Sequence, residues 1–536
     1  MSEDQSTVIA FLSAAESYGE TAAVSRIDTH AAIVFLVGAR AFKMKKAVKF
    51  PFLDFSTLAL REAAVKREIA INRRYAPEIY LGALAVTRRA DGVLALGGGL
   101  GFAGDGPPVE WLTVMNRFDE AATLDHLCSE GPLRPGVVAD LAGAIARMQA
   151  RAEWREFEPW IADLADYIEQ NHTAFLADPA LFPLEAAHRL RQVAQASHAR
   201  IRDLLVERGR LGCIRLLHGD LHAGNVATID GRPVPFDAIE FDDAIATGDL
   251  LYDSGFLIMD LVGRGQTAAA NVLLWRLIIE TARAAAFAAP EIDRASLLET
   301  VLKREAEGLA ALPLFLMMRA AIRAKVTAAK LPYIEPHAAR QGRAEARHYF
   351  QMAVRELEPL TPRLIAIGGL SGAGKSTLAA NLAPLVGRAP GALHLRTDVL
   401  RKLLFGVGEF DRLGPEAYEP EVSPKIYRLM RETTRAALAA GWPVIVDAVA
   451  SKPQERTAFA DLAKADEIPF TGLWLEAASD TLEARVSSRE RDASDADARV
   501  IAVQAGYDTG PMDWSVIDAG GAPEVTLAQA RAVIGV

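Results

Sequence analysis

The chain has 536 residues, of which 51% are hydrophobic and 24% are charged, and its formal net charge is −10. This length predicts about two to four domains, and the composition excludes collagen, coiled coil and extended disorder. The two cysteines, Cys128 and Cys213, form no CxxC pair, so a disulfide framework is excluded and reduced thiols in a cytoplasmic protein are expected. No secretory signal or membrane-length apolar run is visible, and the net acidity disfavours nucleic acid and membrane as partners.

The first 118 residues predict a small β-rich lobe. Apolar patterning gives three strands and one helix, at 30–36, 40–48, 109–115 and 56–74. Between them, Gly99, Gly101 and Gly104 spell GxGxxG, but Asp105 and two prolines follow instead of a helix. We therefore interpret this segment as a hairpin connection and not as a nucleotide loop.

Residues 119–357 predict a mostly helical lobe. It is interrupted by a strand-and-loop segment at 216–243, and its last helix is expected over 337–357. Two prolines then fall within the connector 358–362. Because proline ends helices and stiffens the chain, we predict a domain boundary there.

Residues 363–536 alternate between short apolar strands and helices. The strands are predicted at 364–367, 393–395, 444–446, 473–475 and 516–517. This alternation predicts a parallel sheet covered by helices, that is, an α/β domain.

The segment HGDLHAGN places Asp220 five residues before Asn225, and Asp237 follows further on. Kinase catalytic loops have this order of residues. Asp220 would orient or deprotonate an acceptor hydroxyl, and Asn225 and Asp237 would hold Mg²⁺ against the phosphates of ATP. A metal pair formed by His218 and His222 is the alternative, although no glutamate lies between them on a helix, as zinc enzymes of that kind require.

A kinase of this type also needs a strand lysine paired with a helix glutamate. Lys43 and Lys45 share one face of the strand 40–48; Lys43 is the first choice for the phosphates and Lys45 the alternative. Glu68 on the following helix is the expected partner, with Glu62 second. The competing interpretation is that the lysines only solvate an edge strand.

The motif GLSGAGKS fits the phosphate-binding loop pattern GxxxxGK[ST], with a strand before it and a helix after it. Backbone N–H groups of such a loop surround phosphates, its lysine reaches the β- and γ-phosphates, and its serine ligates Mg²⁺. The predicted ATP-binding residues of this loop are Gly369, Gly372, Ala373, Gly374, Lys375, Ser376 and Thr377. An ordinary glycine-rich turn is the alternative.

Two aspartates follow strands of the same domain. Asp398 could accept the proton of a substrate hydroxyl, Asp447 could hold the metal, and Arg401 could bind substrate. The arginine-rich segment at Arg485, Arg489 and Arg491 predicts a lid that clamps the transferred phosphoryl group, with a solvated helix face as the alternative.

Positions 1 to about 350 resemble the aminoglycoside phosphotransferase family through HGDLHAGN, FDAIEFDD and GDLLYD. The resemblance implies a protein-kinase-like fold and a hinge at 114–117, including Met115, that contacts adenine through backbone groups. The sequence departs from the family pattern at Glu240, which is expected to add a metal or substrate contact.

Residues 363–536 resemble small-molecule P-loop kinases such as gluconate kinase and chloramphenicol phosphotransferase. They are also similar to zeta-toxin and polynucleotide-kinase-like proteins. The resemblance rests on GGLSGAGKST, RTDVLRK, VIVDA and the arginine-rich segment. The whole chain resembles fusions of an aminoglycoside-phosphotransferase-like domain with an ATP-binding P-loop domain.

These observations predict an α+β protein-kinase-like domain over 1–357, with lobes at 1–118 and 119–357, followed by the P-loop domain. The expected function is ATP- and Mg²⁺-dependent phosphoryl transfer by both domains to hydroxyl groups of small polar metabolites. Two alternatives stay open: one domain is a nucleotide-sensing regulator, or the P-loop domain acts like a zeta-toxin or a polynucleotide kinase. The sequence identifies neither acceptor and leaves the oligomeric state open.

Overall fold

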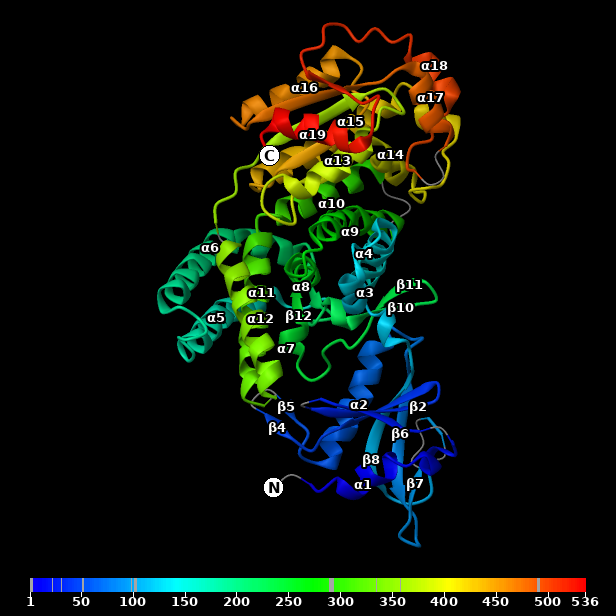
Figure 1. Ribbon diagram of the computed structural model, residues 1–536, viewed down its shortest axis with the longest axis vertical. Coiled ribbons are helices and arrows are strands. Elements are labelled where there is room, and N and C mark those ends of the chain that lie inside the picture. The colour runs from blue at the N-terminus through cyan, green and yellow to red at the C-terminus, as the bar shows by residue number, and fades with distance from the viewer. Residues whose placement is uncertain are drawn as a thin grey trace. The chain divides into compact units, whose positions relative to one another are not determined.

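The structure is a computed structural model that describes residues 3–21, 23–29, 31–50, 53–97, 99–100, 104–288, 294–333, 335–356, 358–488 and 492–536 (Figure 1). The chain forms two compact units. The first consists of Met1–Gly131, Arg151–Glu156 and Gly212–Asp253, and the second of Pro132–Ala150, Phe157–Leu211 and Ser254–Val536.

The first unit is built on a six-stranded sheet of antiparallel pairs with the order β1-β2-β3-β8-β6-β7. The strands are β1 (Ser25–Asp28), β2 (Ala32–Val37), β3 (Arg40–Lys45), β6 (Tyr80–Arg88), β7 (Leu94–Leu96) and β8 (Pro108–Asn116). The three strands predicted for this lobe are β2, β3 and β8, each within a few residues of the expected bounds.

Two helices cover opposite faces of this sheet. Helix α2 (Leu58–Asn72) packs Val65 and Ile69 against Trp111, whereas α1 (Ser6–Leu12) joins the core cluster that contains Leu112. Adjacent strand residues point to opposite faces, so Trp111 and Leu112 mark the two sides. Thr57 caps α2 by accepting a hydrogen bond from the N–H of Leu60 at 3.4 Å.

The rest of the first unit is made of short elements, several of which flank the HGDLHAGN segment. They are β4 (Lys49–Phe50), β5 (Leu53–Asp54), η1 (Ala15–Tyr18), η2 (Glu120–Ala122), α3 (Leu124–Glu130), β9 (Ile214–Leu216), η3 (Ala223–Asn225), β10 (Val226–Ile229), β11 (Arg232–Pro235), α7 (Asp243–Ala246) and β12 (Thr247–Asp249). Strands β10 and β11 form a hairpin, and β12 pairs with β9. The strand-and-loop character predicted for 216–243 is thereby confirmed.

The second unit begins with a bundle of helices. These are α4 (Pro135–Ala150), α5 (Phe157–Leu176), α6 (Leu184–Arg210), α8 (Leu250–Gly263, whose first turn belongs to the first unit), α9 (Thr267–Ala288), α10 (Arg294–Gly308), α11 (Leu312–Lys330), η4 (Leu331–Tyr333) and α12 (Pro336–Arg355). Helix α4 packs on α9, α5 on α6, and α11 on α12. Among the described residues, no helix combines the length and apolar character that a membrane span requires.

A five-stranded parallel sheet completes the second unit, with the order β14-β15-β13-β16-β17. The strands are β13 (Leu364–Gly369), β14 (Leu393–Arg396), β15 (Val444–Asp447), β16 (Phe470–Glu476) and β17 (Ser515–Asp518). The helices are α13 (Lys375–Leu382), η5 (Ala383–Leu385), α14 (Thr397–Phe405), η6 (Pro415–Tyr418), α15 (Val422–Ala439), α16 (Pro453–Ala465), α17 (Ser479–Ser487), α18 (Ala498–Gln504) and α19 (Pro523–Ile534). All five predicted strands are present, and the predicted parallel sheet is confirmed.

The predicted boundary at 358–362 lies inside the second unit. Helix α12 ends at Arg355, close to the expected end of the last helix of the helical lobe. However, α10 packs on α15, and α9 packs on β14 and η5. The helical lobe and the P-loop domain therefore share one compact unit, whereas the β-rich lobe and the HGDLHAGN segment form the other.

Candidate active sites

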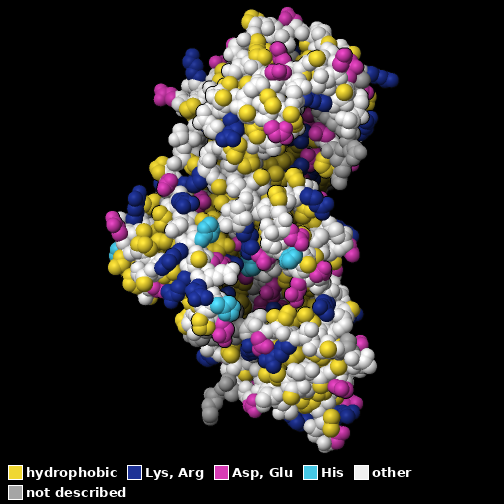
Figure 2. Space-filling model, in the orientation of Figure 1, with side chains coloured by type: hydrophobic (Ala, Val, Ile, Leu, Met, Phe, Trp, Pro, Cys, Tyr) yellow, Lys and Arg dark blue, Asp and Glu magenta, His cyan; other side chains and the backbone are white. Residues whose placement is uncertain are grey.

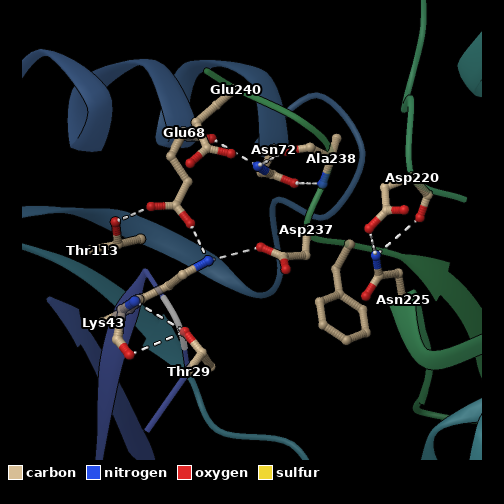
Figure 3. A network of polar contacts seen from close by, with 12 residues as sticks. Thr29, Lys43, Glu68, Asn72, Thr113, Asp220, Asn225, Asp237, Ala238 and Glu240 are labelled. Carbon is tan, nitrogen blue, oxygen red and sulfur yellow. Dashed lines mark hydrogen bonds and ion pairs between the residues drawn. The ribbon is translucent and has the colours of Figure 1, made fainter. Parts of the chain in front are cut away.

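Lys43 lies at the centre of a polar network in the first unit (Figure 3). Its Nζ donates to Oε1 of Glu68 at 2.7 Å and to Oδ1 of Asp237 at 2.8 Å. Burial alone would lower the pKa of Lys43, but the Asp237 and Glu68 carboxylates outweigh it and hold that pKa well above its ordinary value. The strand lysine and helix glutamate chosen from the sequence therefore do meet, whereas Glu62 pairs with Lys66 on the exposed side of α2.

Lys45 serves a second ion pair, which lies deeper than the first. It is 3% exposed, pairs with Glu240, and lies 3.1 Å from Oε2 of Glu68, to which Thr113 also donates at 2.7 Å. Burial would raise the pKa of Glu68, but Lys43 and Lys45 outweigh it and lower that pKa to about 2. Neither lysine merely solvates an edge strand.

The expectation that Glu240 contacts metal or substrate needs correction. Glu240 is 6% exposed and its carboxylate is paired with Lys45. Burial raises its pKa, an effect that Lys45 only partly offsets. The structure gives Glu240 a role in holding the loop after Asp237, not a position at an open site.

Asp237 itself is held by its backbone. Its φ of 61° lies in the left-handed region, which non-glycine residues adopt rarely. Its N–H donates to the Tyr80 hydroxyl at 3.1 Å, and the N–H of Ala238 donates to Oδ1 of Asn72 at 2.8 Å. Sequence reasoning missed Asn72, Tyr80 and Thr113, because only the folded chain brings them to the loop.

Asp220 and Asn225 also meet. Nδ2 of Asn225 donates to the backbone oxygen of Asp220 at 2.9 Å and to its Oδ2 at 3.2 Å. In Figure 3, Asp237 lies between Lys43 and this pair. The structure therefore gathers the predicted base, both predicted metal ligands and the predicted phosphate lysine.

The alternative of a metal pair at His218 and His222 loses support. Nε2 of His218 already pairs with the backbone oxygen of Phe236 at 2.9 Å. His222 accepts a hydrogen bond from the N–H of Gly224 and so caps η3. Burial lowers the pKa of His218, although Asp253 and Asp220 oppose this, so the ring is neutral near pH 7 and acts as a structural link.

The residues of this site fit magnesium better than a softer metal. Among the described residues, no group of three or more His, Cys, Asp or Glu side chains could enclose a metal. Asn225 and Asp237 offer two oxygen ligands, and Mg²⁺ usually takes its remaining ligands from phosphates and water.

Met115 and the predicted adenine hinge lie at the end of β8. Met115 packs against the cluster that contains Tyr80 and Val234. The N–H groups of Asn116 and Arg117 already donate to the backbone oxygens of Ile79 and Ala39. Adenine contact by this hinge stays a prediction.

The phosphate-binding loop of the second unit leads from β13 into α13. Gly369 and Gly372 have φ values of 141° and 84°, and a Cβ on Gly372 would lie 2.6 Å from the backbone oxygen of Leu482. Nζ of Lys375 donates to the Leu370 oxygen at 3.0 Å, across the loop. This strand–loop–helix geometry is the one that the phosphate-binding motif predicts.

A cavity of about 960 Å³ opens at this loop. Predicted residues that line it are Gly372, Gly374, Lys375, Ser376, Thr377, Asp398, Arg401 and Arg485. The structure thus brings most of the predicted ATP-binding and substrate residues of this domain around one space. Gly369 and Ala373 belong to the same loop but are buried in the strand end and the core.

Asp398 and Asp447 are in opposite electrostatic states. Burial raises the pKa of Asp398, although Arg396 opposes it. Burial acts on Asp447 in the same direction, but His394 and Arg396 outweigh it and lower the pKa of Asp447 to about 2. Oδ2 of Asp447 lies 3.5 Å from Nε of Arg396 and 3.7 Å from Nε2 of His394, so this carboxylate is charged and paired, whereas the raised pKa of Asp398 suits a proton acceptor.

The four arginines predicted to act at this site differ. Arg401 lies over the Tyr418 ring at 5.0 Å and donates to the Ala417 oxygen at 2.6 Å. Arg485 donates to the backbone oxygens of Ala519 and Gly521, at 2.8 and 3.0 Å, so its guanidinium is already engaged at the cavity edge. Arg489 and Arg491 lie outside the described residues.

The comparisons with known proteins cover both parts of the chain. Residues 364–508 match the family model described as an AAA domain. Uncharacterised proteins of Mycobacterium tuberculosis H37Rv and Mycobacterium bovis are each 28% identical over 522 residues, which is 94% of this chain and 94% of theirs.

Solved structures are similar at low identity. A sugar kinase from Janibacter sp. is 23% identical and covers 32% of this chain and 95% of its own, with a TM-score of 0.24. A choline kinase from Cryptosporidium parvum is 11% identical and covers 65% and 95%, with a TM-score of 0.38. An aminoglycoside phosphotransferase from Alicyclobacillus acidocaldarius is 12% identical and covers 62% and 91%, with a TM-score of 0.31.

The AAA match and the chain's own geometry agree with the predicted organisation. The predicted residues Lys43, Glu68, Asp220, Asn225 and Asp237 meet on an α+β framework, and an α/β P-loop domain follows it. The chain therefore combines an α+β N-terminal part, which carries the residues predicted for a kinase site, with a C-terminal P-loop domain that matches the AAA model.

Proposed function

We propose that the chain is a tandem phosphotransferase, in which each site transfers the γ-phosphoryl group of ATP to a hydroxyl of a small polar metabolite. One observation carries most of the proposal: Lys43 contacts both Glu68 and Asp237, and the hydrogen-bonded Asp220–Asn225 pair lies beside Asp237 (Figure 3). This arrangement positions a cation for phosphate, oxygen ligands for a metal and a base for the acceptor.

In the N-terminal site, Asp220 orients the acceptor hydroxyl and takes its proton as the hydroxyl oxygen bonds to the γ-phosphorus and ADP leaves. Lys43 donates to phosphate oxygens while Glu68 keeps it charged and in place. Mg²⁺, when bound by Asn225 and Asp237, would neutralise charge on the phosphates.

In the P-loop site, backbone N–H groups at the start of α13 and the Lys375 ammonium bind the phosphates. Ser376 and Asp447 are the metal-side residues, and Asp398 accepts the proton of the acceptor. The raised pKa of Asp398 makes it a stronger base than an exposed aspartate.

A small-molecule acceptor is favoured over nucleic acid. On the face that Figure 2 shows, basic and acidic side chains of the described residues are interspersed and form no continuous basic band. A nucleic-acid groove usually concentrates Lys and Arg along one track.

The test is an ADP-release screen of a metabolite library with Mg–ATP. Wild type is compared with Asp220→Asn, Lys375→Ala and the double variant. Each single variant should lose one set of acceptor-dependent activities and keep the other, and the double variant should lose both. Wild-type activity in both single variants would contradict the proposal, whereas loss in only one would favour a single active domain with a regulatory neighbour.

A further inference from the structure

Residues 404–418 lead from the end of α14 to Tyr418, the residue of this segment that lines the P-loop cavity, and we call this segment the acceptor wall. It includes the end of α14, the helix that carries Asp398 and Arg401, and it ends at Tyr418, which lines the cavity. Arg401 closes the segment onto α14 by its hydrogen bond to the Ala417 oxygen. The position of this segment therefore sets where Tyr418 stands in the cavity that Asp398 and Arg401 also line.

Side chains from α9 and α10 of the helical lobe bind the first part of the acceptor wall, residues 404–409. Arg276 of α9 forms an ion pair with Glu409, and these residues are 8% and 9% exposed. About two turns further along α9, Arg283 donates to the backbone oxygen of Val407. Arg294, at the start of α10, donates to the Leu404 oxygen at 3.5 Å.

A second set of contacts joins the acceptor wall to Asp495, in the segment before α18. Asp495 accepts from Lys402 at 2.6 Å, from the Tyr418 hydroxyl at 2.6 Å and from the N–H of Leu413 at 3.2 Å. Lys402 is 1% exposed. The segment is thus held between Asp495 and the helices α9 and α10.

The contacts of Arg276 and Arg283 depend on the charge and the planar shape of the guanidinium group. A buried ion pair is costly to break, because the remaining charge has no partner. A guanidinium also presents several donors in a fixed plane, so Arg276 and Arg283 hold both a carboxylate and a backbone oxygen of the wall. Other links between the helical lobe and the P-loop domain do not involve the acceptor wall, such as the exposed pair of Arg428 on α15 with Glu299 on α10.

We infer that Arg276 and Arg283 of the helical lobe are positioning residues of the P-loop site, which hold the acceptor wall in place beside Asp398. The consequence is that acceptor binding in the C-terminal domain depends on helices which, in sequence, belong to the N-terminal kinase-like region. The inference rests on the proposed function only in calling the cavity an acceptor site.

The test measures amide hydrogen exchange of the full chain. Arg276→Ala should raise exchange in 404–418 by about tenfold or more, while exchange in β13 and β15 stays at the wild-type rate. Glu409→Gln should do the same, and the double variant should add little, because both changes break one pair. Arg276→Lys should restore part of the protection, and the control Arg428→Ala should leave 404–418 unchanged.

Two results would overturn the inference. One is wild-type exchange in 404–418 of Arg276→Ala; the other is an equal increase throughout the parallel sheet, which would show general loosening. Affinity for Mg–ADP, measured by calorimetry, should stay within about twofold of wild type in Arg276→Ala, because Arg276 contacts Glu409 and not the loop that carries Lys375. If the wild type binds no Mg–ADP, the proposed function fails, and the exchange data still decide whether the arginines hold the wall.

Discussion

The two proposed phosphate sites of this chain are built from different chemical groups. In the first unit, charged side chains from β3, α2 and two loops are already paired with each other, with Lys43 between Glu68 and Asp237. In the second unit, the groups proposed to bind phosphate are mainly backbone N–H groups of one glycine-rich loop and of the start of α13. The first site needs many distant residues to meet, whereas the phosphate-binding part of the second lies within residues 369–377.

This difference has consequences for mutation. A side-chain site should fail when one functional group changes, even if its shape is kept. A backbone site should tolerate many side-chain changes but not a change that closes the loop. The predictions below test this contrast, from the largest expected effect to the smallest.

The largest effect is expected for Asp220→Asn. The amide keeps the shape of the carboxylate but cannot take a proton, so turnover at the N-terminal site should fall by about 10³–10⁴-fold. ADP release in a Lys375→Ala background isolates this site, and affinity for Mg–ATP should change little. A loss of less than about tenfold would mean that Asp220 is not the base.

The two neighbouring lysines should separate stability from activity. Lys45→Ala leaves buried Glu240 without its partner and should lower the free energy of local unfolding by about 3–5 kcal/mol. Lys43→Ala should cost less stability, because Glu68 retains Lys45 and Asp237 can reach water, but it should abolish turnover at this site. Hydrogen exchange in β3 and α2 measures the first quantity and ADP release the second.

The exposed pair Lys66–Glu62 supplies the control for the lysine experiment. Lys66→Ala should change stability by less than about 1 kcal/mol, as is typical of surface ion pairs. Equal losses of stability in Lys43→Ala and Lys45→Ala would show that the two pairs are not distinct in depth.

Glu356, at the end of α12, predicts a pH effect. Burial raises its pKa to about 7, an effect that Arg388 only partly offsets. The folded form therefore keeps a proton between pH 4.5 and 7 that the unfolded form releases, so the stability that Glu356 contributes below pH 4.5 is lost as pH rises to 7. The loss should be on the order of 2–3 kcal/mol.

Replacement of Glu356 by Gln should remove this dependence of the folding stability on pH. The stability of Glu356→Gln relative to wild type, followed by hydrogen exchange in α12, should increase between pH 4.5 and 7. A difference that does not vary with pH would contradict the prediction.

The smallest effect is expected for Gly372→Ala, which tests the backbone site. The new Cβ would lie 2.6 Å from the Leu482 oxygen at a φ of 84°, and such strain costs about 1–3 kcal/mol. Affinity for Mg–ADP at the P-loop site should fall by about 10–100-fold, measured by calorimetry in a Lys43→Ala background. Gly136→Ala, at an open position, is the control and should have no effect.

The same contrast explains what the sequence could predict. The P-loop was readable because its residues are contiguous and their spacing reflects the geometry of phosphate itself. Asp220, Asn225 and Asp237 were readable as a fixed order of residue types, and Lys43 and Glu68 from strand and helix periodicity. These five residues do meet in the structure.

What the sequence could not predict depends on long-range packing. The side chains of Asn72 and Tyr80 hold the Asp237 loop by accepting hydrogen bonds from its backbone N–H groups. Because every residue has such groups, these contacts leave no signal in the sequence. Glu240 was expected to be a ligand because it departs from the family pattern, but the folded chain buries it in an ion pair with Lys45. The contacts of Arg276 and Arg283 with 404–409 join residues more than a hundred positions apart, across a boundary that the prolines suggested.

The packing of α9 and α10 on the P-loop domain also bears on how the chain responds to proteolysis. A protease that cleaves the connector at 358–362 would cut the polypeptide, but Asn271, Arg276 and Arg283 would still bind the C-terminal fragment. The two fragments should migrate together on a sizing column and separate only in denaturant.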